Sequence, residues 1–123
     1  MAVEAGASAL GLVSEMPSGP GVISESKIRQ ISLAFSHRVE TFLLTSRTQP
    51  AQIAEQHRRC RTTTVQLVDC VSERDLEAIR RTLHGVRLVQ VVHVHDENAI
   101  RDAIRLSGYV DALLLDSGNT TQQ

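Results

Sequence analysis

The stretch LVQVVHVHDENAIRDAIRLSGYVDALLLD, residues 88–116, has the pattern of one strand–helix–strand unit. Its two apolar runs, Leu88–Val94 and Val110–Leu115, are short and rich in β-branched residues or leucine, which is typical of buried strands. Between them, Asp96 is placed to cap a helix and Gly108 to end it. Strands that are separated by a single helix are expected to be parallel and joined by right-handed crossovers.

The same unit repeats toward the N-terminus of the chain. Further strands are expected at Leu10–Val13, Val39–Leu44 and Thr63–Val68, with helices that begin after Ser24, at Pro50 and after Ser72. The fold class is therefore α/β with a parallel (βα) repeat. A self-contained flavodoxin-like or receiver-like domain has the same pattern. A first strand in the centre of the sheet would favour that alternative, and sequential neighbours throughout would favour a barrel.

Composition limits the classes of partner. The 123 residues carry 13 Lys plus Arg and 14 Asp plus Glu, a formal net charge of −1, so no global positive field collects nucleic acid. Phe35, Phe42 and Tyr109 are the only aromatic residues, too few for a base-stacking platform. No apolar run approaches the roughly 20 residues that span a bilayer. Two cysteines, Cys60 and Cys70, fit a reducing compartment, and we expect a cytoplasmic protein without nucleic-acid or membrane partners.

Asp116 is the first candidate for chemistry, because ligands of parallel βα folds bind beyond the carboxyl ends of the strands. The leucines before it should partly remove it from water, which favours the protonated form that a general acid needs. An aspartate that accepts backbone N–H bonds after the strand is the structural alternative.

Other polar positions are weaker candidates. His93 and His95 alternate along one expected strand and so share a face, but no further ligand has a recognisable spacing with them and we expect no metal site. Gln66 could reach a ligand, or be a buried glutamine tied to the backbone. The loop Pro17–Ser24 could cradle an anion, although a plain connection is favoured. Arg58, Arg59 and Arg61 are expected to form a solvated helix end.

The order of these features resembles the phosphoribosylanthranilate isomerase family. The resemblance rests on four stretches and extends over essentially the whole chain: Ala5–Val13, Met16–Ser24, Thr64–Leu67 and Val110–Ser117. It implies an incomplete TIM (βα)8 barrel with five strands, from strand two to strand six. Residues 1–117 would form this partial barrel domain, with residues 2–8 as the last turns of a helix and 118–123 as a polar tail.

The resemblance also implies an activity. The family catalyses the Amadori rearrangement of N-(5-phosphoribosyl)anthranilate to carboxyphenylamino-deoxyribulose phosphate in tryptophan biosynthesis, without cofactor or metal. The family's general acid falls on Asp116. Gly21, Gln66 and His93 are the candidate substrate-binding residues, and the substrate is a phosphorylated small molecule.

Several family features are altered or missing. The family's base is a cysteine in a Lys-Ile/Val-Cys-Gly motif, which neither Cys60 nor Cys70 matches, and no part of the sequence matches the loops that bind phosphate. Gly21 stands where many members have an arginine that contacts the anthranilate carboxylate, and Val68-Asp69 replaces a common His-Gly. We therefore expect little activity from the isolated chain. The alternative is a non-catalytic, truncated barrel module that self-associates or pairs with a complementary fragment through its open sheet edges.

Overall fold

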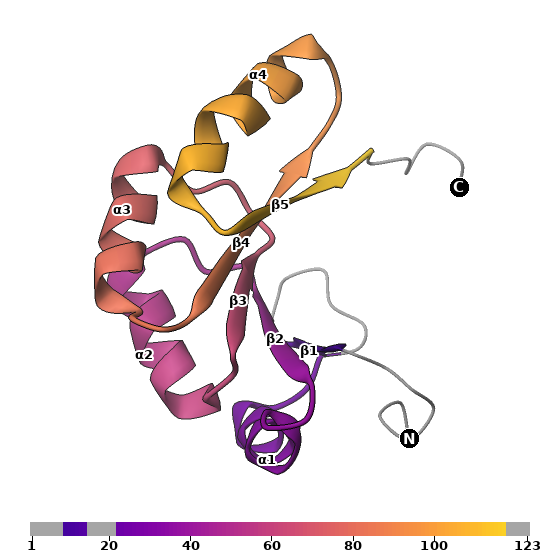
Figure 1. The fold of residues 1–123 in the computed structure, drawn as a ribbon, viewed down its shortest axis with the longest axis vertical. Helices are drawn as coiled ribbons and strands as arrows, with labels where there is room; N and C mark the ends of the chain where they lie inside the picture. The colour runs from indigo at the N-terminus through magenta and orange to yellow at the C-terminus, as the bar shows by residue number, and fades with distance from the viewer. Residues whose placement is uncertain (1–8, 15–21, 118–123) are drawn as a thin grey trace.

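The computed structural model describes residues 9–14 and 22–117. In this part of the chain, five strands alternate with four α-helices, and a short 3₁₀ turn precedes the last strand (Figure 1). The strands are β1 (Ala9–Val13), β2 (Glu40–Thr45), β3 (Thr64–Leu67), β4 (Arg87–His93) and β5 (Ala112–Asp116). The helices are α1 (Glu25–Phe35), α2 (Pro50–Cys60), α3 (Glu73–Thr82) and α4 (Glu97–Leu106), and the 3₁₀ turn is η1 (Ser107–Tyr109).

The helices begin at the residues that the sequence indicates. The side chains of Ser24, Ser72 and Asp96 each accept a hydrogen bond from the backbone N–H three residues ahead, at 3.2–3.3 Å. Pro50 occupies the first turn of α2, where its missing N–H costs nothing. Helix α2 ends at Arg61, whose φ of 62° places a residue other than glycine in the left-handed region.

The strands are parallel and follow one another in the sheet in the order β1-β2-β3-β4-β5. This sequential order confirms the parallel (βα) repeat and the barrel-type winding. A flavodoxin-like sheet would place its first strand in the centre, whereas β1 and β5 lie at the two edges here. The sheet does not close on itself (Figure 1).

The hydrophobic core lies between the sheet and the helices, which all cover the same face of the sheet (Figure 1). Leu43, Val65 and Leu88 are neighbours in register on β2, β3 and β4, and each is at most 2% exposed. They pack in one cluster with apolar side chains from the four helices, among them Ile28, Ile53, Leu76, Ile79, Ala103 and Leu106. Removal of this surface from water is the main favourable contribution to folding.

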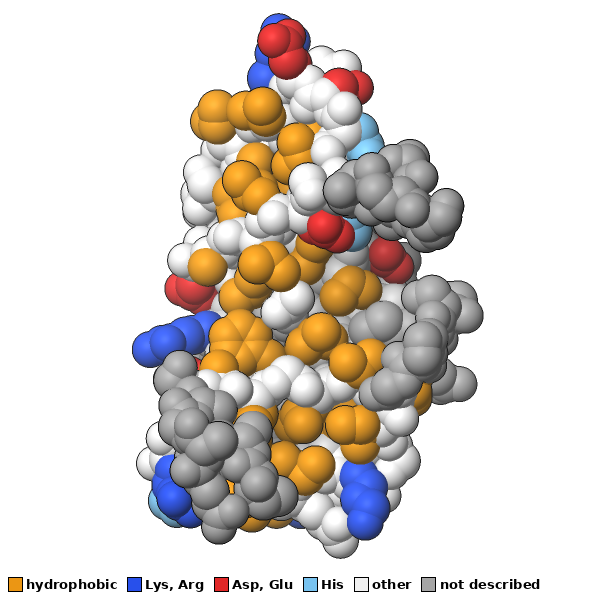
Figure 2. All heavy atoms as spheres, turned by 90° about the vertical axis from the view of Figure 1, so that its right-hand side faces the viewer, with side chains coloured by type: hydrophobic (Ala, Val, Ile, Leu, Met, Phe, Trp, Pro, Cys, Tyr) orange, Lys and Arg blue, Asp and Glu red, His pale blue; other side chains and the backbone are white. Residues whose placement is uncertain are grey.

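None of the described helices lies on the opposite face of the sheet, and hydrophobic side chains gather across it (Figure 2). Phe42 and Leu44 of β2 are half-buried there, and Leu114 of β5 is 48% exposed. The expectation that Val110–Leu115 is a buried strand is therefore wrong for β5. Among the described strands, β5 pairs only with β4, so its leucines remain partly in contact with water.

Three segments that the sequence singled out lie outside the described residues: the helical turns at 2–8, most of the Pro-rich loop including Gly21, and the tail at 118–123. Among the described helices, none combines the length and the apolar character needed to cross a membrane.

Candidate functional site at the carboxyl ends of the strands

Parallel strands bring their carboxyl ends to one rim of the sheet. Thr45 ends β2, Val68 follows β3, His93 ends β4 and Asp116 ends β5. The side chain of Asp116 is 52% exposed, so it is about half removed from water. Leu115, which precedes it on the edge strand β5, is 60% exposed.

The rim brings His93 and Asp116 together. They are direct partners in the β4–β5 register, and the Nδ1 atom of His93 lies 3.4 Å from Oδ2 of Asp116. The other ring nitrogen, Nε2, lies 3.0 Å from the carbonyl oxygen of Val68. The backbone at Asp116 is held as well, because its carbonyl accepts a 2.8 Å hydrogen bond from the N–H of Val94. Sequence reasoning placed both residues at the rim but missed their pairing, which depends on register.

The two histidines lie side by side, as their alternation predicts. The ring of His93 stacks on that of His95, with centroids 6.5 Å apart and planes inclined by 19°. Within residues 9–14 and 22–117, no three His, Cys, Asp or Glu side chains converge in a way that could hold a metal ion.

Gln66 is half-buried on β3, and its register partners are Leu44 and Val89. By strand alternation it lies on the helix-free face, the same face as Asp116. The buried glutamine tied to the backbone is instead Gln90, whose Nε2 donates to the carbonyls of Leu67, Asp69 and Val91 at 2.9–3.2 Å. Its Oε1 has no hydrogen-bond partner among the described residues.

The two cysteines have different environments. Cys60 is fully buried at the end of α2, and this burial raises the pKa of its thiol to about 11. Cys70 is exposed just beyond β3, where it lines a cavity of about 180 Å³ together with His93 and His95. A thiol with a raised pKa is a poor source of thiolate at neutral pH, so Cys60 is not a candidate base.

A polar network connects the end of β2 to the first two helices. The hydroxyl of Thr45 donates to Oε1 of Gln56 at 2.7 Å, and Nε2 of Gln56 donates to Glu25 at 3.1 Å. Arg59 also donates to Glu25, at 2.7 Å, and this bond is the main cause of the lowered pKa of the Glu25 carboxyl. Arg58, Arg59 and Arg61 are exposed at the end of α2, which agrees with a solvated helix end, and Arg59 in addition links α2 to α1.

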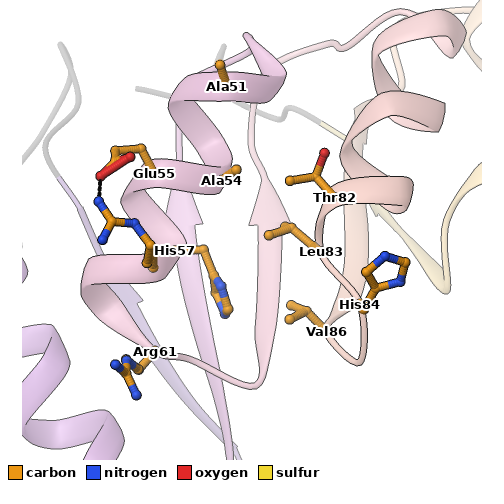
Figure 3. A pocket seen from close by; sticks show the side chains of 10 residues that line it. Ala51, Ala54, Glu55, His57, Arg61, Thr82, Leu83, His84 and Val86 are labelled. Atoms are coloured by element: carbon orange, nitrogen blue, oxygen red, sulfur yellow. Dashed lines mark hydrogen bonds and ion pairs between the residues drawn. The ribbon is translucent and has the colours of Figure 1, made fainter.

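A groove of about 610 Å³ lies between α2 and α3, on the helix layer rather than at the strand ends (Figure 3). His57 points into it, but Nε2 of this ring already lies 2.7 Å from the carbonyl oxygen of Thr62. Glu55 forms an ion pair with Arg58. Because these polar groups are occupied by each other or by the backbone, the rim is the better candidate site.

A parallel βα sheet wound in sequence order, with an acid at its carboxyl-end rim, is the architecture of the (βα)-barrel class, and the described residues supply five of its strands in a sheet that does not close. No family model matches the chain. Within the barrel class the chain is similar to phosphoribosylanthranilate isomerases. The curated N-(5'-phosphoribosyl)anthranilate isomerase of Methanocella arvoryzae is 28% identical over 114 residues, which cover 93% of this chain and 54% of the relative.

Solved structures show the same fold. A phosphoribosylanthranilate isomerase from Thermotoga maritima superimposes with a TM-score of 0.78 at 21% identity, over 98% of this chain and 60% of its own. A second isomerase, in complex with reduced 1-(o-carboxyphenylamino)-1-deoxyribulose 5-phosphate, gives a TM-score of 0.76 at 24% identity, over 94% of this chain and 56% of its own. The chain thus spans just over half the length of the relatives that it matches.

Proposed function

We propose that this chain is the acid-bearing part of an isomerase of the phosphoribosylanthranilate type, with Asp116 as its general acid. The observation that carries the proposal is the sequence similarity over 93% of the chain, together with the position of Asp116 at the carboxyl end of β5. In the reaction, Asp116 gives its proton to the ring oxygen of the ribose as the bond from that oxygen to C1 breaks. A base then removes the proton from C2, and the resulting enolamine tautomerises to the ketone.

The substrate that we propose is an anionic, phosphorylated aminoaldose. The name of the curated relative contains a phosphoribosyl and an anthranilate group, and a related structure binds an analogue with a carboxyphenyl group and a phosphate. The rearrangement moves protons within one molecule, so it requires no cofactor. We propose Gly21, Gln66 and His93 as substrate contacts. We also propose that the protein is located in the cytoplasm.

We further propose that the isolated chain does not turn over this substrate. Cys60 has its thiol in the core, and Cys70 does not match the family's base motif. Loss of a positioned base typically lowers the rate by about 10²–10⁴.

Loss of anthranilate fluorescence measures the turnover. We expect none with the chain alone, and turnover after mixing with a fragment of the Methanocella relative that supplies the remaining strands. In the mixture, Asp116→Asn should lower kcat by about 10²–10⁴. Asp69→Asn, which removes an exposed carboxylate just after β3, is the matched control and should retain activity. If the mixture that contains Asp116→Asn turns over the substrate as fast as the mixture that contains the parent chain, the role of Asp116 as general acid is refuted.

A second candidate function, a non-catalytic module that self-associates, is favoured by the surface next to β5. Ile100 is 51%, Ile104 70% and Leu115 60% exposed, and these side chains line an apolar cavity of about 300 Å³ between α4 and β5. Contiguous exposed apolar surface beside an open sheet edge is typical of an interaction surface.

Light scattering distinguishes this function from the first. Self-association predicts a mass above that of one chain, which Ile104→Glu lowers. Leu33→Glu, at a 56% exposed leucine on α1, is the matched control and should leave the mass unchanged. A sharp monomer peak with a cooperative melt would exclude the module.

A further inference from the structure

We infer that Arg47 is a substrate-binding residue, which holds an anionic group of the substrate, a carboxylate or a phosphate, at the carboxyl end of β2. The inference deepens the proposed function and rests on it for the identity of the substrate. The affinity for an anion rests on the position, the anchoring and the charge of Arg47 in the structure.

The first argument is the position of Arg47 in the fold. It is the second residue after β2 and therefore lies at the rim that the carboxyl ends of the strands form. Asp116 lies at the same rim, at the end of β5, and β3 and β4 separate the two strands in the sheet. Ligands of parallel βα folds bind at this rim, where residues from several strand ends contact one molecule. Arg47 and Asp116 would thus contact different parts of the same substrate.

The second argument is the anchoring of the backbone that carries Arg47. Its N–H donates to Oγ1 of Thr45 at 3.1 Å, and the Thr45 hydroxyl donates in turn to Gln56 at 2.7 Å. The carbonyl of Thr45 accepts a 3.0 Å hydrogen bond from the N–H of Val68, which follows β3. Because this part of the rim is fixed before a ligand arrives, binding costs less conformational entropy than it would on a loose loop.

The third argument is how the carboxylate next to Arg47 is used. Nη2 of Arg47 lies 3.9 Å from Oε2 of Glu25, which is an ion pair beyond hydrogen-bond distance. The same carboxylate accepts two hydrogen bonds from Arg59, at 2.7 and 3.3 Å, and one from Gln56 at 3.1 Å. Glu25 is therefore satisfied by other donors, and the guanidinium of Arg47 makes no hydrogen bond to a described residue.

The cluster around Arg47 also has an excess of positive charge. Ion pairs join three guanidinium groups to two carboxylates, those of Arg47, Arg58, Arg59, Glu25 and Glu55, which leaves one positive charge. Arg58 and Arg59 donate hydrogen bonds to these carboxylates, so Arg47 is the member of the cluster that an anion can bind. Its side chain is 34% exposed, so a bound oxyanion is partly shielded from water. A guanidinium fork forms strong, charge-assisted hydrogen bonds to a carboxylate or a phosphate.

The test titrates the isotope-labelled chain with reduced 1-(o-carboxyphenylamino)-1-deoxyribulose 5-phosphate, the analogue bound by a related isomerase. We expect the analogue to shift the NMR signal of the Arg47 Nε–Hε group, and calorimetry gives the dissociation constant. Arg47→Ala retains the N–H that bonds to Thr45, so it removes only the guanidinium, and it should weaken binding by about 10- to 100-fold. Arg47→Lys retains the charge without the fork and should bind with intermediate affinity. Arg101→Ala, at an exposed arginine on α4, is the matched control and should leave binding unchanged.

Separate titrations with benzoate and with inorganic phosphate identify the group that Arg47 binds, because only that group should shift its Nε–Hε signal. The inference is overturned if none of the three anions shifts this signal, or if Arg47→Ala binds the analogue as tightly as the parent chain.

In the fragment mixture, Arg47→Ala should raise KM by about 10- to 100-fold with little change in kcat, because the contact is present in both the bound substrate and the transition state. If the mixture shows no turnover while anion binding depends on Arg47, the proposed function fails and the anion site stands. If turnover depends on Asp116 while KM does not depend on Arg47, the anion site fails and the proposed function stands.

Discussion

Substitution of Thr45 by valine tests the polar network that connects the rim to the first two helices. Thr45 is fully buried, and valine has nearly the same shape, so the change removes a hydroxyl without leaving a cavity. Two groups lose a partner: Oε1 of Gln56, in a side chain that is 1% exposed, and the backbone N–H of Arg47, which donates to Thr45 at 3.1 Å. A buried polar group without a partner costs about 1–3 kcal/mol, so the free energy of unfolding should fall by about 2–3 kcal/mol.

Urea unfolding followed by circular dichroism measures this loss as a lower midpoint at an unchanged slope. Thr48→Val is the matched control, because the hydroxyl of Thr48 makes no hydrogen bond to a described residue, and it should change stability by less than about 0.5 kcal/mol. In Thr45→Val/Gln56→Leu the orphaned amide is removed as well, so the double variant should be more stable than the sum of the single losses predicts, by about 1 kcal/mol. A loss below about 0.5 kcal/mol for Thr45→Val would refute the assignment of this network as buried and satisfied.

Three further predictions concern other regions. A thiol reagent should label Cys70 rapidly in the folded chain and Cys60 only after unfolding, since Cys60 is buried; mass spectrometry that finds rapid labelling of Cys60 would contradict its place in the core. The hydrogen bond from Arg80 lowers the pKa of the Asp111 carboxyl below its ordinary 3.8, so the unfolded state binds the proton more readily. The stability that this shift contributes is present above pH 3.8 and is lost as the pH falls through the lower, folded-state pKa. Asp111→Asn should therefore flatten the acidic part of a curve of unfolding free energy against pH, measured by urea unfolding. An unchanged curve would disprove the effect of Arg80 on the Asp111 carboxyl. Arg61→Gly should raise the free energy of unfolding by about 0.5–1 kcal/mol, because glycine adopts the observed φ of 62° without strain; a lower urea midpoint would count against a strained helix end.

Local sequence patterns predicted the elements of the fold well. Caps at Ser24, Ser72 and Asp96 and the proline that opens α2 indicate helix starts through interactions within four residues of the chain, and the structure confirms all of them. The strand positions follow from short apolar runs in the same way. Strand order required one further inference, that single helices connect parallel neighbours, and the sequential sheet confirms it.

Features that depend on distant partners were not predicted. The leucines of β5 look buried in the sequence because apolar runs do not reveal whether a strand has one neighbour or two. The ion pair of Arg59, which is exposed at the end of α2 as expected, was missed because its partner Glu25 lies 34 residues away in the chain. The pairing of His93 with Asp116 depends on the register of two strands, which the sequence alone leaves open.

The sequential order of the strands has a consequence for how the chain folds. Each strand pairs only with strands from the adjacent βα units, so every pairing in the described sheet closes a loop that contains one helix. Loop-closure entropy is then similar for each of the described pairings. Within the described sheet, folding can begin at any adjacent pair of strands and spread outward one unit at a time, as in repeat proteins.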